Sequence, residues 1–152
     1  MKKIESIDNL VLIVNNLLTK YIQLHNRLFK FSIKKIIPIP FIFKPIDFNK
    51  FSYEINEVLD GLKWCYRERS NFPMSNQNKE LMIIMEKYIF TLILTLEQLL
   101  LVSENLRNKA NGEVYDFKIY KQDVDRYNEL VEKYRYLGKQ LNMLWNKNKD
   151  RI

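Results

Sequence analysis

Glycine and proline are scarce in this chain of 152 residues, which contains 3 glycines and 4 prolines. Sheet-rich folds need frequent turns, and turns draw heavily on these two residues, so sandwiches, barrels and doubly wound folds are disfavoured. Apolar residues make up 47% of the sequence, which is typical of a globular chain and excludes wholesale disorder. The length is that of one domain, so we interpret residues 1–152 as a single helical unit.

Four stretches carry apolar residues at helical spacing. We expect helices over about residues 6–32, 48–69, 76–108 and 116–147, the last beginning at either Asp116 or Lys121. Asn111-Gly112 marks the turn before the last helix. The candidate N-caps, whose side chains can accept from free backbone N–H groups, are Ser6 or Asp8, Asp47 and Ser75.

The apolar positions of these helices define a candidate core. The first helix contributes Ile7, Leu10, Leu12, Ile13, Leu17, Leu18, Tyr21, Leu24, Leu28 and Phe31. The second contributes Phe51, Ile55, Val58, Leu59, Leu62, Cys65 and Tyr66, and the last contributes Val124, Tyr127, Val131, Tyr134, Leu137, Leu141 and Leu144. The third helix is apolar on most sides, which is typical of the central helix of a bundle.

Residues 33–47 hold three of the four prolines, Pro38, Pro40 and Pro45, so this segment should be extended or turning. It is also apolar, and an apolar connection is normally packed onto the body of the protein. We interpret it as a crossover strap. The alternative is an arm that binds a partner or a second subunit, with Ile39, Phe41 and Phe43 as its candidate contacts. The predicted fold is all-α, an antiparallel four-helix bundle with an apolar proline-rich link between the first two helices.

Catalytic and metal-binding patterns are missing. His25 is the only histidine, so histidine-pair metal sites and the Glu-x-x-His motif of di-iron bundles are impossible; we expect it at a polar surface position. Cys65 has no second cysteine, which excludes an internal disulfide and points to a reducing, cytoplasmic setting. Glu54, Glu57 and Asp60 share one helix face, which we interpret as solvated. We therefore expect a protein that is not an enzyme and that binds no cofactor and no metal. We also expect no convincing membrane span, since the most hydrophobic stretch covers only residues 88–96.

The net charge of +7 favours a polyanion or a membrane surface as the partner. Residues 1–50 carry 9 basic and 3 acidic groups, whereas residues 51–100 carry 5 and 7. Basic rows at helical spacing could follow a phosphate backbone, although the ordinary polar face of a bundle helix is the alternative. The candidate nucleic-acid-binding residues are Lys20, Arg27, Lys30, Lys34 and Lys35 near the first helix, and Arg126, Lys133, Arg135 and Lys139 on the last.

Aromatic residues offer two further hypotheses. Tyr127, Tyr134 and Trp145 recur at helical spacing, which favours core packing over stacking on unpaired bases. Trp64 lies beside the inward stripe of the second helix and could anchor a subunit contact, because tryptophan is enriched at the centres of interfaces.

The last helix carries a family resemblance. It reads Tyr127-x-x-Leu130-x-Glu132, then Leu137-Gly138-x-x-Leu141, with Trp145 closing. This pattern resembles the terminal helix of the accessory variability determinant (Avd) proteins, which serve the reverse transcriptase of diversity-generating retroelements and whose four-helix fold the related rRNA intervening-sequence proteins share. Lys139 stands where that family has arginine, and Asn142-Met143 replaces its paired glycines. The resemblance implies a four-helix bundle that forms a homo-oligomeric ring and binds RNA and a reverse transcriptase without catalysing a reaction.

The charge and the resemblance together predict a function. We expect a non-enzymatic basic bundle that binds nucleic acid, most simply RNA, as an accessory subunit of a reverse-transcriptase or other ribonucleoprotein assembly. The alternative is a structural or protein-interaction component of a phage or mobile-element assembly. In either case we expect a cytoplasmic homo-oligomer with no membrane partner.

Overall fold

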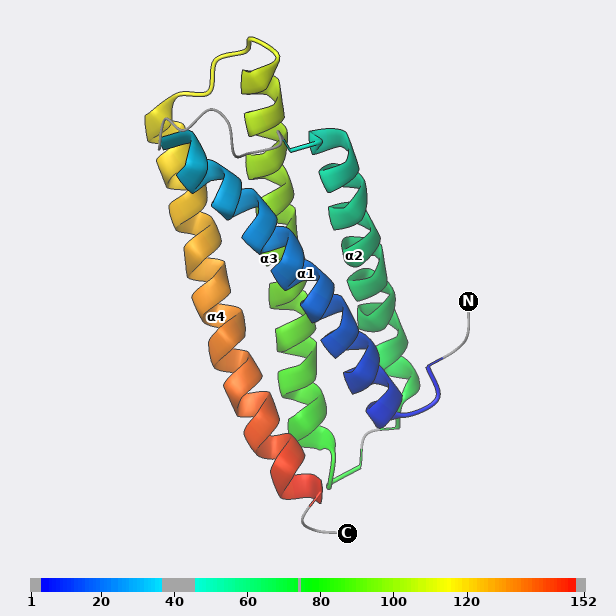
Figure 1. Ribbon diagram of the computed structural model, residues 1–152. Helices are drawn as coiled ribbons and strands as arrows, with labels where there is room; N and C mark the ends of the chain where they lie inside the picture. Colours follow the sequence, from blue (N-terminus) through cyan, green and yellow to red (C-terminus); the bar gives the residue numbers. More distant parts are fainter. Residues whose placement is uncertain (1–3, 37–45, 74, 150–152) are drawn as a thin grey trace.

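The computed structural model describes residues 4–36, 46–73 and 75–149, with the backbone alone described at 30–36 and 149. Four long helices follow one another in these ranges: α1 Ile7–Ile36, α2 Phe48–Glu68, α3 Lys79–Ala110 and α4 Phe117–Lys149. A single 3-10 turn, Arg69–Asn71, ends α2. Successive helices run in opposite directions, and α1 crosses obliquely over the layer formed by the other three (Figure 1). The predicted all-α antiparallel four-helix bundle is confirmed.

Helix α3 is the centre of the bundle. It lies between α2 and α4 and packs along both, and it also contacts α1 (Figure 1). Its buried side chains include Met85, Leu92, Leu96 and Leu99, as expected for the most apolar helix. The buried hydroxyls of Thr91 and Thr95 each donate to the carbonyl four residues earlier, at 2.8 and 2.7 Å, so these polar groups enter the core with their hydrogen bonds satisfied.

The helix ends follow local chemistry. Ser6 and Asp47 act as the predicted caps: the Ser6 hydroxyl accepts from the Asn9 N–H at 3.1 Å, and the Asp47 carboxylate accepts from the Asn49 and Lys50 N–H groups. The predicted start of α3 was wrong. Ser75 and Asn78 bond reciprocally around a turn, and the helix begins at Lys79.

The first helix is longer than predicted. It continues to Ile36, so residues 33–36 are helical and the expectation of an extended segment from residue 33 is wrong. The reason is that a proline disfavours helix mainly in the residue before it, and the first proline is Pro38, so residues 33–36 are free to continue the helix. Residues 37–45 lie outside the described part of the chain. The strap-or-arm alternative and the candidate contacts Ile39, Phe41 and Phe43 therefore stay predictions.

The predicted core is confirmed for most positions of α2 and α4. Leu12 departs from the expectation, because it is 58% exposed, and two apolar residues of the third helix, Ile83 and Phe90, are 39% and 48% exposed. Leu12 lies on the outer side of α1, and the other two lie on the outer side of α3. A helix that is apolar all round still shows one face to solvent when only three neighbours cover it.

The α3–α4 hairpin is closed by specific contacts. Gly112 has a φ of 97°, a left-handed conformation that favours glycine and confirms the predicted turn. The Tyr115 hydroxyl donates to the Asp123 carboxylate at 2.6 Å, and the Gln98 amide donates to the Asp123 carbonyl at 3.0 Å. Further along α4, a Cβ at Gly138 would lie 3.2 Å from the Tyr88 ring, so this glycine lets the two helices approach closely.

The cap at Asp47 gives a prediction for the fold. Replacing Asp47 with Ala leaves two N–H groups of the first turn of α2 without their acceptor, and we expect a loss of roughly 0.5–2 kcal/mol in the free energy of unfolding. Urea denaturation followed by circular dichroism measures it. Asp47→Asn is the control and should stay close to the wild type, because asparagine also accepts at this position. Equal stability of Asp47→Ala and the wild type would show that the cap is dispensable.

Candidate nucleic-acid interface

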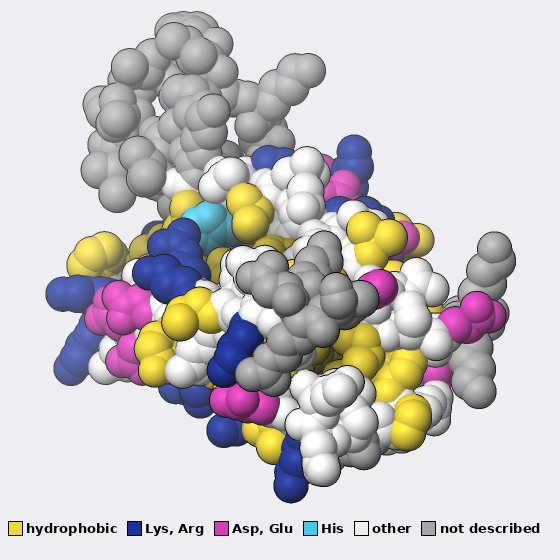
Figure 2. All heavy atoms as spheres, turned by 90° about the horizontal axis from the view of Figure 1, so that it is seen from below, with side chains coloured by type: hydrophobic (Ala, Val, Ile, Leu, Met, Phe, Trp, Pro, Cys, Tyr) yellow, Lys and Arg dark blue, Asp and Glu magenta, His cyan; other side chains and the backbone are white. Residues whose placement is uncertain are grey.

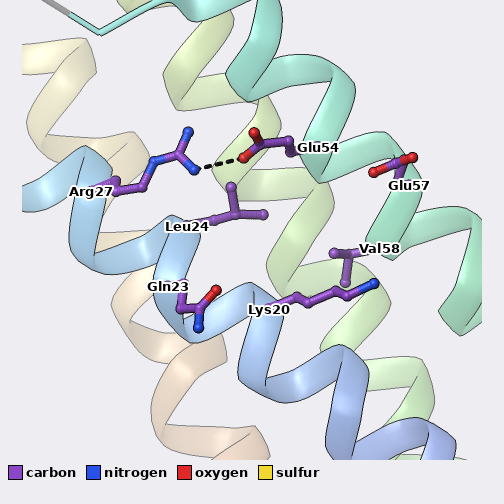
Figure 3. A pocket seen from close by; sticks show the side chains of 7 residues that line it. All are labelled: Lys20, Gln23, Leu24, Arg27, Glu54, Glu57 and Val58. Carbon is purple, nitrogen blue, oxygen red and sulfur yellow. Dashed lines mark hydrogen bonds and ion pairs between the residues drawn. The ribbon is translucent and has the colours of Figure 1, made fainter.

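Two residues of the basic row predicted on the first helix, Lys20 and Arg27, lie beside α2 rather than facing open solvent. Arg27 Nη1 lies 2.7 Å from Glu54 Oε2, and its guanidinium sits 5.7 Å from the centre of the Phe51 ring. Lys20 extends toward α2 two turns earlier on α1, in the same groove as Glu57 (Figure 3). This groove has a volume of about 330 Å³.

The α1–α2 groove is balanced in charge. A second hollow of about 360 Å³ continues it, lined by Lys20, Glu57, Asp60 and the half-buried Trp64. The carboxylates expected to be a merely solvated face thus lie opposite the basic row, where they offset the field of Lys20 and Arg27. Trp64 borders this groove, and its role as a subunit anchor stays a prediction.

The other predicted first-helix cations continue past the groove. Lys30, Lys34 and Lys35 belong to the last two turns of α1, but their side chains lie outside the described part of the structure. The sequence-based hypothesis for these three residues stays a prediction.

The basic residues of α4 fall on two flanks. Arg126 and Lys133 lie toward α3, where Arg126 is 3.7 Å from Glu129 and Lys133 lines a groove of about 450 Å³ with Lys87. Arg135 lies toward α1, close enough to His25 to act on its protonation. Lys139 follows one turn later on the same side. The four residues predicted as one row therefore form two pairs.

Charge is uneven over the surface. Viewed from the lower end, many of the basic side chains stand on the left, which is the α4 side, with carboxylates among them (Figure 2). Among the described residues, Lys133, Arg135 and Lys139 form no ion pair, in contrast to Arg27 and Arg126. Part of the unpaired positive charge of the described bundle thus lies on α4, which also carries the carboxylates of Asp123, Asp125, Glu129 and Glu132.

A polar chain joins α1 to α4 beneath Arg135. The Tyr21 and Tyr127 hydroxyls are hydrogen-bonded, and the Tyr127 hydroxyl also lies 2.6 Å from His25 Nδ1. Each hydroxyl has one proton, so the chain has a direction: if Tyr127 donates to Nδ1, Tyr21 donates to Tyr127. The His25 ring stacks on Tyr127, at 5.6 Å between ring centres, and packs against Phe29.

Sequence reasoning placed His25 at the surface and missed this chain. The side chain is half-buried, and the histidine is visible at the surface between apolar and basic side chains (Figure 2). Burial lowers the pKa of His25, and the nearby Arg135 guanidinium lowers that pKa further. Burial likewise raises the pKa of Tyr21 and of Tyr127 above the ordinary tyrosine value. The three hydrogen-bonded side chains of Tyr21, Tyr127 and His25 are therefore neutral at pH 7.

The predicted aromatic core is confirmed at two positions. Tyr127 and Tyr134 are buried, and Tyr134 meets the rings of Tyr21 and Tyr88 edge to face. Stacking of these two tyrosines on bases is excluded in the folded bundle, because no ring face is open. Trp145, the third residue of that pattern, is half-buried near the end of α4.

The described residues contain little that suggests chemistry. Within the described ranges, no group of three His, Cys, Asp or Glu residues is placed to hold a metal ion. Burial raises the pKa of the Cys65 thiol to about 11, which leaves it an unreactive core group. By length and apolarity α3 alone among the described helices could cross a membrane, but a central bundle helix passes the same test, and over half of that apolar stretch is buried.

No family model, curated protein or solved structure matches this chain. The similarity of α4 to the Avd proteins therefore stays a resemblance between sequences, and only the bundle fold that it implied is confirmed.

The polar chain gives a prediction for stability. Tyr127→Phe removes the hydroxyl that bridges Tyr21 and His25, so two part-buried or buried polar groups lose a partner, and we expect roughly 1–3 kcal/mol of destabilisation. Urea unfolding measures it. Tyr53→Phe, an equal change at an exposed tyrosine of α2, is the control and should be neutral. A Tyr127→Phe variant as stable as that control would show that the hydrogen bonds of Tyr127 contribute nothing to the stability of the fold.

The lowered pKa of His25 predicts a pH dependence. Below about pH 6.5 the unfolded chain binds a proton at His25 that the folded chain resists, so stability falls as the pH drops through 6.5 and levels off below the folded-state pKa. Unfolding free energies of the wild type and His25→Gln, measured from pH 8 to 5, isolate this effect. The stability difference between the two should shift in favour of His25→Gln at low pH, and a constant difference would contradict the assignment.

Proposed function

We propose that this protein is a non-enzymatic helical bundle that binds nucleic acid, most simply RNA, through the basic flanks of α4. In this proposal it acts in the cytoplasm as an accessory subunit of a ribonucleoprotein or reverse-transcriptase assembly. The observation that carries the proposal is the unpaired positive charge of Lys133, Arg135 and Lys139 on a chain of net charge +7.

The two flanks differ in what they offer a phosphate backbone. Arg135 and Lys139 stand one turn apart beside the α1–α4 seam, where the neighbouring ring, His25, is neutral. Asn128 and Asn142, each two turns from Arg135, are exposed on the same side and can donate hydrogen bonds to phosphate or sugar oxygens. On the opposite flank Lys133 shares its groove with Lys87, and Arg126 is partly engaged by Glu129. The Arg135 side is therefore the stronger candidate.

Affinity at such a surface comes from released counterions. Each neutralised phosphate adds about 0.7 to 0.9 to the slope of the logarithm of the affinity against the logarithm of salt concentration. The balanced α1–α2 groove should add little, because a phosphate that approaches Lys20 or Arg27 also meets Glu54 and Glu57.

A structural role in a protein assembly is the second candidate. The specific observation that favours it is the exposed apolar side of α3, where Ile83, Phe90 and Leu101 are more than a third exposed. The aliphatic side chains of this face have no counterpart on a phosphate backbone, so the face points to protein contacts.

The nucleic-acid proposal is tested with a neutralised pair. We expect Arg135→Gln with Lys139→Gln to lower the salt slope for a structured RNA by about 1.5, since two phosphate contacts are lost. Fluorescence anisotropy from 50 to 300 mM salt measures it. Lys50→Gln with Lys109→Gln removes the same charge at exposed positions near the upper helix ends and is the matched control (Figure 1).

Three outcomes would contradict this assignment. If both double variants reduce the slope equally, binding follows net charge and not the α4 flank. If the wild type does not bind RNA at 50 mM salt, the nucleic-acid function fails. If affinity is unchanged by salt, the contacts are not phosphate contacts.

A further inference from the structure

The outer face of α3, which points away from the other three helices, carries a ridge of apolar side chains with Lys87 and Glu97 between them. Ile83, Phe90 and Leu101 are 39%, 48% and 42% exposed, and Leu94 between them is half-buried. Tyr66 of α2 packs beside Phe90 at 6.0 Å between ring centres. On the other side the exposed Tyr136 of α4 joins Phe90 in lining a groove of about 450 Å³. A surface of this kind marks a contact site.

The ridge has a symmetric spacing. The residues along its crest are, in order, Ile83, Lys87, Phe90, Leu94, Glu97 and Leu101, and the exposed Glu86, which pairs with Arg69, flanks it. The intervals between them are four, three, four, three and four, so the ridge reads the same in both directions. Alternation of three and four is the spacing of a helix seam that packs against another helix.

The side chains of two such ridges are complementary when the ridges are antiparallel. When a second ridge is laid antiparallel on the first, Ile83 meets Leu101, Phe90 meets Leu94, and Lys87 meets Glu97. Every apolar residue then faces an apolar one, and the cation faces the anion. A parallel pairing would place Lys87 against Lys87 and Glu97 against Glu97, which is repulsive.

We propose that α3 pairs through this ridge with α3 of a second copy of the chain, antiparallel, about a two-fold axis level with Leu92. The contact is self-complementary, as two-fold dimer interfaces are, because each copy supplies both halves of every pair. The ridge from Ile83 to Leu101 spans about 27 Å at 1.5 Å per residue, long enough for a helix-to-helix seam. This inference does not depend on nucleic-acid binding.

The charged residues of the ridge are available for the pairing. Lys87 forms no ion pair in the described part of the chain and shares its groove with a second cation, Lys133, so a carboxylate from another copy would meet two positive groups. Glu97 is 3.7 Å from Lys63, with both side chains nearly half exposed, which is a weak pair that leaves the carboxylate open. A lipid surface fits less well, since Glu86, Lys87 and Glu97 would enter the apolar layer.

Charge reversal tests the pairing in the full chain. We expect the wild type to form a dimer in sedimentation and light scattering, and Lys87→Glu or Glu97→Lys alone to weaken dimerisation by at least tenfold. The double variant Lys87→Glu with Glu97→Lys should restore it, because the pair is re-formed with its signs exchanged. Phe90→Ser should also weaken the dimer, whereas Leu12→Ser, on the outer side of α1, should not.

Cysteine cross-linking tests the register. Ile83→Cys and Leu101→Cys chains, mixed under oxidising conditions, should form a disulfide with each other. Neither should cross-link with itself, because its two copies would lie about 27 Å apart. Cys65 does not compete, since it is buried.

The outcomes separate the proposal from its rivals. A wild type that stays monomeric, a double charge variant that fails to restore the dimer, or self-linking of Ile83→Cys would each overturn it. Loss of the dimer with Leu12→Ser as well as Phe90→Ser would place the contact elsewhere. Binding of the monomer to phospholipid vesicles, abolished by Phe90→Ser, would assign the face to a membrane. Circular dichroism melts of all variants show whether the fold is retained.

Discussion

The burial of α3 by its three neighbours is the constraint on which the rest of this structure depends. Its apolar residues cover most of its circumference, whereas α1, α2 and α4 each have a clear polar side. The three amphipathic helices can therefore satisfy their own apolar stripes only by packing around or across α3. Three helices do not enclose a fourth, so one apolar side of α3 reaches solvent. The molecule therefore has both a compact core and an exposed apolar surface.

The same packing decides which charges are free. Because α1 crosses the layer, its basic flank comes to rest against the carboxylates of α2, and the Arg27–Glu54 pair closes part of that groove. The basic residues of α4 share their own helix with acidic ones such as Glu129 and Glu132; one basic pair borders the α1 seam and the other borders α3. The basic excess of the first fifty residues is thus partly offset at the α1–α2 groove, whereas Lys133, Arg135 and Lys139 of α4 keep their charge without an ion pair among the described residues.

The sequence pattern predicted what depends on single helices. Periodicity located the four helices and most of their buried stripes, and Asp47 and Gly112 revealed local geometry because capping and left-handed turns need particular residues. It could not predict relations between helices. The pairing of Arg27 with Glu54 and the bond between His25 and Tyr127, which are 102 positions apart, depend on how each helix is rotated and crossed. The end of α1 was also predicted too early, because a proline restricts the one residue before it and not a whole segment.

The Tyr21–Tyr127–His25 chain has a consequence for how the bundle reaches a single arrangement. Apolar stripes tolerate a shift of one helix along another, because one leucine replaces the next at little cost. The hydroxyl–hydroxyl–imidazole chain does not, since a slip of one turn between α1 and α4 would leave the Tyr21 and Tyr127 hydroxyls, deep in the interior, without partners. These hydrogen bonds thus select one register for α1 against α4. That register in turn sets which side chains of α1 contact α2 and which contact α4.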